Sequence, residues 1–126
     1  MSNVVSQSFL EKIIEVWQEE VLAIILFGSA ARGELQSHSD IDLLLVLAPQ
    51  IEISREYYRR WEMFYDNNRV LISHEKEISP HFVNLASDPL QVGGLWYEVA
   101  LEGMVLWQKD PSSVGVFLMD IPIGSN

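Results

Sequence analysis

The stretch that decides the fold is Val21-Leu-Ala-Ile-Ile-Leu-Phe27, followed directly by Gly28-Ser29-Ala30-Ala31-Arg32-Gly33. A continuous apolar run of this length, rich in β-branched residues, is typical of a strand that is buried on both faces. Gly28 ends the run, and the small residues after it predict a turn that leads into a short helical segment. The sequence therefore predicts a central strand that opens into a glycine-containing turn.

A second buried strand is predicted at Ile41–Leu47, and two aspartates, Asp40 and Asp42, stand where it begins. Residues two apart in a strand point to the same face, and their side chains start roughly 7 Å apart. Two bare carboxylates about 5 Å apart repel by roughly 3 kcal/mol at an effective dielectric constant near 20. A hard divalent cation such as Mg²⁺ removes this repulsion, because it prefers oxygen ligands. The pair therefore indicates a metal site completed by the phosphates of a nucleotide.

The turn after the first strand has the features of a phosphate-binding site. A glycine at the strand end lets the backbone approach a phosphate, since no Cβ is in the way. The Ser29 hydroxyl and the N–H groups of the following turn can hold a phosphate oxygen. Arg32 can add a charge-assisted contact to a triphosphate. Ser39 can either cap the turn before Asp40 or contact phosphate.

The rest of the chain alternates between helical and extended patterns. Apolar periodicity predicts three helices, and shorter apolar runs predict three further strands. The pattern favours an α/β (α+β) domain in which a small mixed β-sheet packs against helices, mainly aromatic ones. We assign residues 1–110 to one domain and expect residues 111–126 to form a loosely ordered tail. The further helices are expected at Ser6–Glu20, Ile53–Asn68 and Pro89–Glu102, and the strands at Arg69–Ser73, His81–Ala86 and Met104–Trp107.

Composition narrows the class of protein. The 126 residues suit a single domain, and a 48% apolar content is enough to bury a core. The net charge of −10, without a basic stripe, argues against direct binding to nucleic acid. The lack of cysteine excludes disulfides, thiolate catalysis and a cysteine-based zinc site. The apolar runs are too short to cross a bilayer, and the polar N-terminus shows no signal-peptide pattern, so we expect a cytoplasmic protein.

These motifs together resemble a known family. Gly28-Ser29, a gap of ten residues, and then Asp40-Ile41-Asp42 are similar to the signature of the DNA polymerase β-like nucleotidyltransferase superfamily. The chain resembles most closely its minimal nucleotidyltransferase branch, short prokaryotic proteins with Gly-Ser-x-Ala-Arg-Gly and Ser-Asp-Ile-Asp-Leu motifs. Both motifs are unbroken here, and a weaker similarity extends to the Glu-Gly-x-x-Leu pattern that ends at Leu106.

The resemblance implies an activity, a cofactor and a partner. It implies transfer of a nucleoside monophosphate from ATP, or another NTP, to a hydroxyl group, with Mg²⁺ held by Asp40 and Asp42. Gly28, Ser29 and Arg32 would then bind the phosphates. Several minimal members are antitoxins that silence a helical HEPN-type ribonuclease toxin by adenylylating it on tyrosine. A toxin of this kind, or a second copy of the chain, is therefore the expected protein partner.

The match fails at the third carboxylate of the superfamily. Minimal members tend to read Asp-hydrophobic-Val-Asp-Leu on a later strand, where this chain reads His81-Phe82-Val83-Asn84-Leu85. His81 can accept the proton of the nucleophile or bind a metal, or it is a strand-end residue in a protein whose catalysis is weakened or lost. Three nearby acids, Glu75, Glu77 and Asp88, can substitute for it.

Two functions remain open from the sequence alone. The leading hypothesis is a Mg²⁺-dependent nucleotidyltransferase in which Asp40, Asp42 and His81 are catalytic. The alternative is a degenerate domain of the same fold that acts by contact with its partner. Modification of a small antibiotic would by family analogy need a second substrate-binding domain, for which this chain is too short unless it dimerises.

Overall fold

A computed structural model describes residues 5–34, 40–72, 77–110 and 114–122. It contains four strands and four α-helices, joined in part by short 3-10 segments. The helices are α1 (Gln7–Trp17), α2 (Arg55–Asn67), α3 (Gly94–Glu102) and α4 (Val114–Met119). The strands are β1 (Val21–Phe27), β2 (Ile41–Leu47), β3 (Ile78–Asn84) and β4 (Met104–Gln108). The 3-10 segments are η1 (Gln18–Glu20), η2 (Gly28–Ala30), η3 (Arg69–Leu71) and η4 (Pro89–Gln91).

The four strands form one mixed sheet in the order β3-β2-β1-β4. Strand β1 runs antiparallel to both β2 and β4, whereas β2 and β3 are parallel. The two continuous apolar runs of the sequence are therefore the two central strands, which explains why neither has a polar face. The predicted fold class, a mixed sheet packed against helices, is confirmed.

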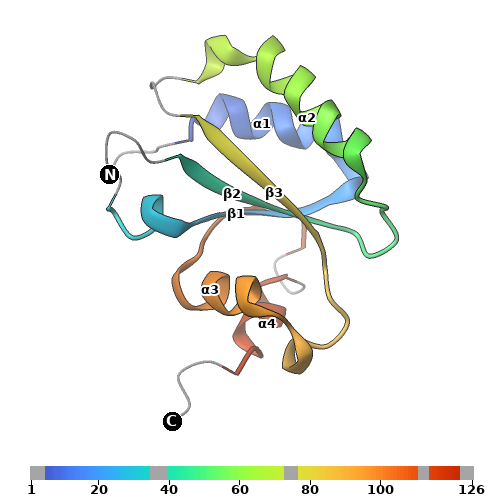
Figure 1. The fold of residues 1–126 in the computed structure, drawn as a ribbon, viewed down its shortest axis with the longest axis vertical. Helices are drawn as coiled ribbons and strands as arrows, with labels where there is room; N and C mark the ends of the chain where they lie inside the picture. The colour runs from blue at the N-terminus through green and yellow to red at the C-terminus, as the bar shows by residue number, and fades with distance from the viewer. Residues whose placement is uncertain (1–4, 35–39, 73–76, 111–113, 123–126) are drawn as a thin grey trace.

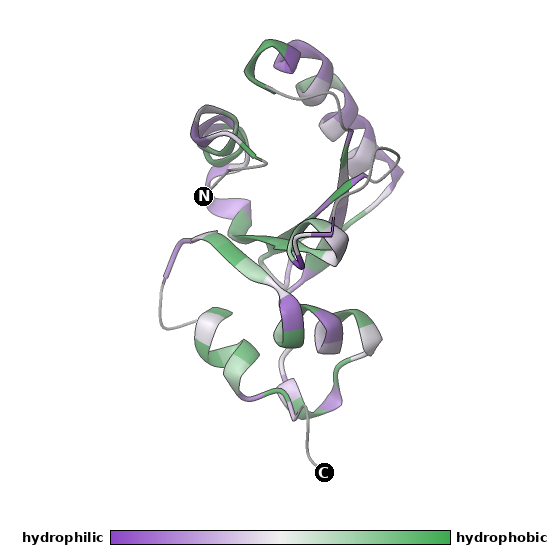
Figure 2. Ribbon diagram, turned by 90° about the vertical axis from the view of Figure 1, so that its left-hand side faces the viewer, coloured by the Kyte–Doolittle hydropathy of each residue, from purple (hydrophilic) through white to green (hydrophobic). Residues whose placement is uncertain are grey.

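Helices cover both faces of the sheet, so the domain has three layers (Figure 1). Alternate residues of β1 and β2, such as Ile24 and Leu45, face α1 and α2 in the larger core. The intervening residues, such as Ile25 and Leu44, face α3 and α4 in a second core. Figure 2 shows the same two groups of helices on opposite sides of the strands. Hydrophobic and hydrophilic residues alternate along the helices. Successive residues along the central strands thus face opposite helical layers.

The larger core is dominated by aromatic rings from α1, α2 and β3. The Trp17 ring meets the Phe64 ring edge-on, with centroids 5.1 Å apart. The centroid of the Phe9 ring lies 5.4 Å from that of the Phe64 ring. Phe82 of β3 completes the cluster against Tyr57, at 4.9 Å. Aromatic pairs of this geometry are each worth about 0.5–1.5 kcal/mol beyond the burial of their area. The predicted packing of the aromatic helices on the sheet is therefore present.

Two tyrosines and a proline close the outer edge of β3. The Tyr65 hydroxyl accepts a hydrogen bond from the Ile78 N–H at 3.0 Å, and the Tyr58 hydroxyl lies 3.4 Å from the Phe82 nitrogen. Between them, Pro80 has no N–H to offer. An edge strand with unpaired donors is a template for pairing with another chain. Helix α2 removes that possibility at β3, and Pro80 is tolerated because this strand lies at the edge.

Three sequence-based expectations are corrected by the fold. The segment at Arg69–Ser73, predicted as a strand, begins instead as the 3-10 helix η3, because the Asn68 carbonyl accepts the Leu71 N–H at 2.9 Å. The predicted helix Pro89–Glu102 is divided into η4 and α3, and two glycines, Gly93 and Gly94, lie where α3 begins. The predicted strand His81–Ala86 starts three residues earlier, at Ile78.

Part of the segment after residue 110 forms a helix that the sequence did not predict. Residues 111–126 were predicted to be a loosely ordered tail, but Val114–Met119 form helix α4. Val114, Phe117 and Ile121 are buried in the second core, where the Phe117 ring lies 5.1 Å from the Trp96 ring. A short helix of this kind is stabilised by tertiary burial rather than by its own propensity, which is why local sequence did not reveal it.

Within the described ranges, no helix is both long enough and apolar enough to span a lipid bilayer.

Replacing Tyr65 with phenylalanine should destabilise the domain by about 1–3 kcal/mol, because the buried Ile78 N–H loses its acceptor. Urea denaturation followed by tryptophan fluorescence measures this difference. Tyr97→Phe is the matched control, since Tyr97 is partly exposed and its hydroxyl makes no hydrogen bond within the described residues. Equal stability of the two variants would contradict the assigned role of Tyr65.

Candidate functional site

The candidate site lies where β1 ends and β2 begins, on the face that carries the second core. Phe27, the last residue of β1, is in register with Asp42, the second residue of β2. Asp42, Leu44 and Val46 are alternate residues of β2, so their side chains point to the same face of the sheet. Leu44 and Val46 both belong to the second core. The Asp42 side chain is about one-third exposed, so it lies at the margin of the core and is open to a ligand.

Gly28 is in direct contact with the Asp42 carboxylate. Its φ of +74° lies in the left-handed region, which side chains disfavour. A Cβ at this position would lie 2.5 Å from Asp42 Oδ2, closer than non-bonded atoms can approach. Glycine is therefore required at position 28 both for the backbone conformation and for the space that the carboxylate fills. The two motifs singled out in the sequence, Gly-Ser and Asp-x-Asp, meet at this contact.

The turn after Gly28 is held by its own backbone. The N–H groups of Ala31 and Arg32 both donate to the Gly28 carbonyl, at 3.1 and 3.2 Å. Gly33 closes the turn with a φ of +72° and donates to the Ala30 carbonyl at 3.2 Å. None of these bonds uses the N–H groups of Ser29 and Ala30, which come first in the turn. The predicted phosphate-binding turn therefore has two backbone donors at its start.

His81 lies on the other side of Asp42. Its Nε2 atom is 3.1 Å from Asp42 Oδ1, and its ring meets the Phe27 ring edge-on with centroids 5.0 Å apart. An ionised carboxylate can only accept, so this contact requires the proton of a neutral imidazole to be on Nε2 and leaves Nδ1 as the basic nitrogen. His81, which the resemblance predicts to stand in place of a third acid, is thus in contact with one of the two aspartates.

The other residues that the sequence predicts for the site lie in different surroundings. Asp40 is exposed and directly precedes β2, where the Ile41 N–H donates to the Glu77 carbonyl at 2.9 Å. Ser39 lies outside the described residues, as does Glu75. Of the other two acids considered as substitutes, Glu77 pairs with Arg69 at 3.4 Å and Asp88 caps η4 at 2.9 Å. In the part of the chain that is described, no group of three or more His, Asp or Glu residues could hold a metal.

Arg32 does not lie free for a phosphate. Its Nε donates to Glu34 and its Nη1 donates to Glu102, both at 2.9 Å. These two hydrogen bonds raise the pKa of the guanidinium above its ordinary value. Glu102 is the last residue of α3, so Arg32 ties the turn to the helix that covers this face. Glu102 opens the Glu-Gly-x-x-Leu pattern of the sequence, but it is 70 residues from Arg32, so no local pattern predicts their contact.

Gly28→Ala should destabilise the protein by about 1–3 kcal/mol, because alanine is strained at this φ and its Cβ displaces the Asp42 carboxylate. Thermal and urea unfolding measure the loss. Gly93→Ala serves as the control, since a Cβ there meets nothing within 4 Å and should change stability by less than about 0.5 kcal/mol. If Gly28→Ala were as stable as Gly93→Ala, the contact between the turn and Asp42 would be wrong.

Comparison with known proteins gives matches in both sequence and fold. A family model described as "Polymerase beta, Nucleotidyltransferase" matches residues 11–112, most of the chain. The MJ1305 protein of Methanocaldococcus jannaschii, provisionally named a protein adenylyltransferase, is 41% identical over 46 residues. That alignment covers 36% of this chain and 31% of the relative, so the chain spans less than a third of it.

Solved structures show the same fold at low sequence identity. A chain of a toxin–antitoxin complex with AMP-PNP superposes with a TM-score of 0.60 at 20% identity, covering 91% of this chain and 82% of that chain. A complex of a tri-AMPylated Shewanella oneidensis HEPN toxin with its MNT antitoxin gives a TM-score of 0.50 at 21% identity, covering 90% and 80%.

Proposed function

The chain belongs to the polymerase β-type nucleotidyltransferase family, and on that premise we propose that it transfers AMP from ATP, with Mg²⁺, to a hydroxyl group of a protein. One observation supports the proposal: the Asp42 carboxylate lies between the Gly28 turn, to which we assign the phosphates, and His81, to which we assign the proton of the acceptor. This arrangement matches a reaction in which phosphate and nucleophile approach the same carboxylate.

The donor set fits a magnesium ion whose coordination is completed by the nucleotide. Asp40 and Asp42 offer hard oxygen atoms, and the described residues add no third carboxylate to make a closed cage. Mg²⁺ is usually bound by one or two carboxylates together with phosphates and water, rather than by protein groups alone. When bound, the ion would neutralise charge on the phosphates and on the attacking and leaving oxygens.

Each of the other groups at the site has its own role in the proposed reaction. The N–H groups of Ser29 and Ala30, with the Ser29 hydroxyl, would hold the β- and γ-phosphates. Asp42 accepts from His81 Nε2 and so keeps Nδ1 as the basic nitrogen. Arg32 holds the turn against α3 through Glu102, which makes it a positioning residue rather than a direct phosphate ligand.

The bond changes are those of an adenylyl transfer. The acceptor oxygen attacks the α-phosphorus of ATP and forms the new P–O bond, while the bond from the α-phosphorus to the bridging oxygen breaks. The electron pair leaves with pyrophosphate. The proton of the acceptor hydroxyl passes to His81 Nδ1 and from there to water. Entering and leaving oxygens lie in line on opposite sides of the phosphorus.

The acceptor that these similarities support best is a tyrosine of a HEPN-type toxin, which would make the chain an antitoxin. One structurally similar complex pairs an MNT antitoxin with a HEPN toxin that carries AMP groups, and another toxin–antitoxin complex contains an ATP analogue. The partial relative provisionally named a protein adenylyltransferase points to the same reaction class. The net charge of −10 favours a protein partner over nucleic acid.

Asp42→Asn should reduce transfer of labelled AMP by roughly a hundredfold or more, because a neutral amide cannot hold the metal or fix the His81 tautomer. The assay uses labelled ATP, Mg²⁺ and the product of the neighbouring gene as acceptor. Asp120→Asn, an exposed change on the α4 side of the domain, is the control and should transfer normally. Unchanged transfer by Asp42→Asn would rule out the proposed chemistry.

His81→Ala should lower kcat by about a hundredfold or more while the affinity for ATP stays the same, because the base is lost but the phosphate site is not. His81→Asp, which restores the carboxylate typical of the family, should recover part of the activity. Single-turnover transfer together with equilibrium binding of ATP separates the two effects. A His81→Ala protein with the wild-type kcat would show that this side chain is only structural.

A second function is favoured by one observation. The described residues contain no third carboxylate at the site, which is compatible with a domain that has lost catalysis and acts by contact. Such a protein would form a tight complex with its partner and transfer no label in the assay above. The two functions are therefore separated by the same experiment.

A further inference from the structure

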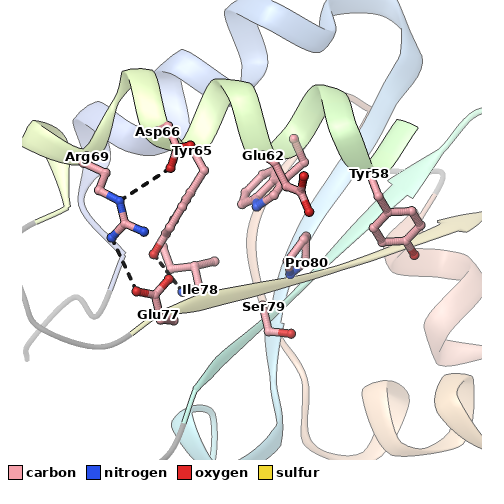
Figure 3. Close-up of a pocket in the computed structure, with 10 residues that line it drawn as sticks. Tyr58, Glu62, Tyr65, Asp66, Arg69, Glu77, Ile78, Ser79 and Pro80 are labelled. Atoms are coloured by element: carbon pink, nitrogen blue, oxygen red, sulfur yellow. Dashed lines mark hydrogen bonds and ion pairs between the residues drawn. The ribbon is translucent and has the colours of Figure 1, made fainter. Parts of the chain in front are cut away.

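Ser79, a residue that no sequence motif marks, lies beside Asp42 in the sheet. The two residues are in register across the parallel strands β2 and β3. Figure 3 shows Ile78 and Pro80 on the side of β3 that faces α2, and Ser79 on the opposite side. Because side chains alternate along a strand, Ser79 shares the face of the sheet that carries Asp42 and His81.

The Ser79 hydroxyl is available to a ligand. The residue is half-buried, and within the described ranges its hydroxyl has no hydrogen-bond partner. A hydroxyl carries two lone pairs as well as a proton, so it can coordinate a cation. Asp40 is exposed and lies on the same ladder, since the Ile41 N–H donates to the Glu77 carbonyl at 2.9 Å.

Ser79 and His81 differ in their position along the two strands. Ser79 is level with Asp42, whereas His81 is two residues further along the sheet, away from Asp40. Residues are spaced about 3.3 Å apart along a parallel strand, and neighbouring strands are about 4.8 Å apart. The Cα atom of Asp40 is therefore about 8 Å from that of Ser79 but about 14 Å from that of His81. An ion between the two aspartates would lie on the Ser79 side of Asp42.

The metal-binding potential of the described residues supports this separation. Among them, no three His, Asp or Glu side chains are placed to hold one metal ion. Asp40, Asp42 and His81 all belong to the described ranges, so they do not converge on one point. The Nε2 atom of His81 instead contacts Asp42 Oδ1 at 3.1 Å. A further protein ligand for an ion on the two aspartates would have to be a residue other than His81.

We propose that Ser79 is the third protein ligand of the metal ion, beside Asp40 and Asp42. The inference rests on the proposed function, because it completes the metal site on which that function depends. Serine and threonine hydroxyls hold Mg²⁺ in other phosphate-transferring proteins. A neutral oxygen suits an ion that also takes phosphate oxygens and water. A hydroxyl on β3 thus stands in for the third carboxylate of the family, and His81 remains the proton acceptor.

Binding of Mn²⁺, a spectroscopic substitute for Mg²⁺, tests this assignment without catalysis. Electron paramagnetic resonance of free Mn²⁺ gives the affinity of each variant in the absence of nucleotide, and circular dichroism confirms that each variant is folded. Ser79→Ala should weaken binding about three- to tenfold, because one oxygen ligand is lost. Ser79→Asp should tighten binding about tenfold or more, since the number of charged ligands sets the affinity.

Ser79→Cys shows whether this side chain reaches the ion itself. A thiolate prefers soft ions, so the variant should bind Mn²⁺ about tenfold more weakly than the wild type and Cd²⁺ about tenfold or more tightly. Bound Cd²⁺ should also give the ultraviolet absorption of a cadmium–thiolate bond. The natural chain contains no cysteine, so this absorption can come only from position 79.

Ser87 provides a matched control for each change, because it is exposed and follows the far end of β3. The alanine, aspartate and cysteine variants at Ser87 should bind Mn²⁺ like the wild type, and Ser87→Cys should bind Cd²⁺ only weakly. Wild-type affinity for Mn²⁺ in Ser79→Ala would overturn the assignment. So would Cd²⁺ binding that is no tighter in Ser79→Cys than in Ser87→Cys.

The metal assignment and the proposed function fail in different ways. Because the binding measurements need no transfer of AMP, the Ser79 variants can bind metal like the wild type while the label-transfer assay succeeds, and then only the assignment is wrong. A protein that binds Mn²⁺ through Ser79 but transfers no AMP would support the assignment and count against the enzymatic activity.

Discussion

The contact between Gly28 and the Asp42 carboxylate is the constraint on which the rest of the site depends. The carboxylate fills the space that any side chain at position 28 would need, and the left-handed backbone of Gly28 turns the chain away from β1 at that point. The turn that follows can therefore present its first N–H groups beside an acid rather than at a distance from it. The absence of a Cβ at position 28 thus brings the backbone donors of the turn close to a carboxylate.

The sheet extends this contact in both directions. On one side, β3 places His81 within 3.1 Å of Asp42, because parallel pairing aligns the two strands over their whole length. On the other, Arg32 links the turn to the end of α3 through Glu102. An exposed ion pair of this kind contributes little to stability. Its effect is positional, since it fixes a loop against a helix that also covers the second core.

The helical layer on the opposite face has a different role. Aromatic rings of α1 and α2 hold the sheet, and α2 also closes the outer edge of β3 with two tyrosine hydroxyls. Arginine occurs twice in this layer between a ring and an acid, at Arg60 and Arg69. The same helix can therefore stabilise the domain and prevent edge-to-edge association at β3.

Local sequence determined the two central strands, the turn and the aspartates at its side, because each depends on short-range rules. A continuous apolar run specifies a doubly covered strand, and a glycine at its end specifies a bend. The resemblance to the family also predicted that His81 stands in place of a third acid. Local sequence did not determine whether Asp40, Asp42 and His81 meet, since their approach depends on strand order and register.

Only the tertiary structure decided which of these residues are in contact. It brought Asp42 together with Gly28 and His81, left Asp40 exposed, and paired Arg32 with acids from two segments. It also decided that Val114–Met119 form a helix, because Phe117 gains its burial from β1, β2 and α3 rather than from its neighbours in sequence. Contacts between residues distant in sequence depend on packing over the whole sheet, and packing is the property that local patterns do not encode.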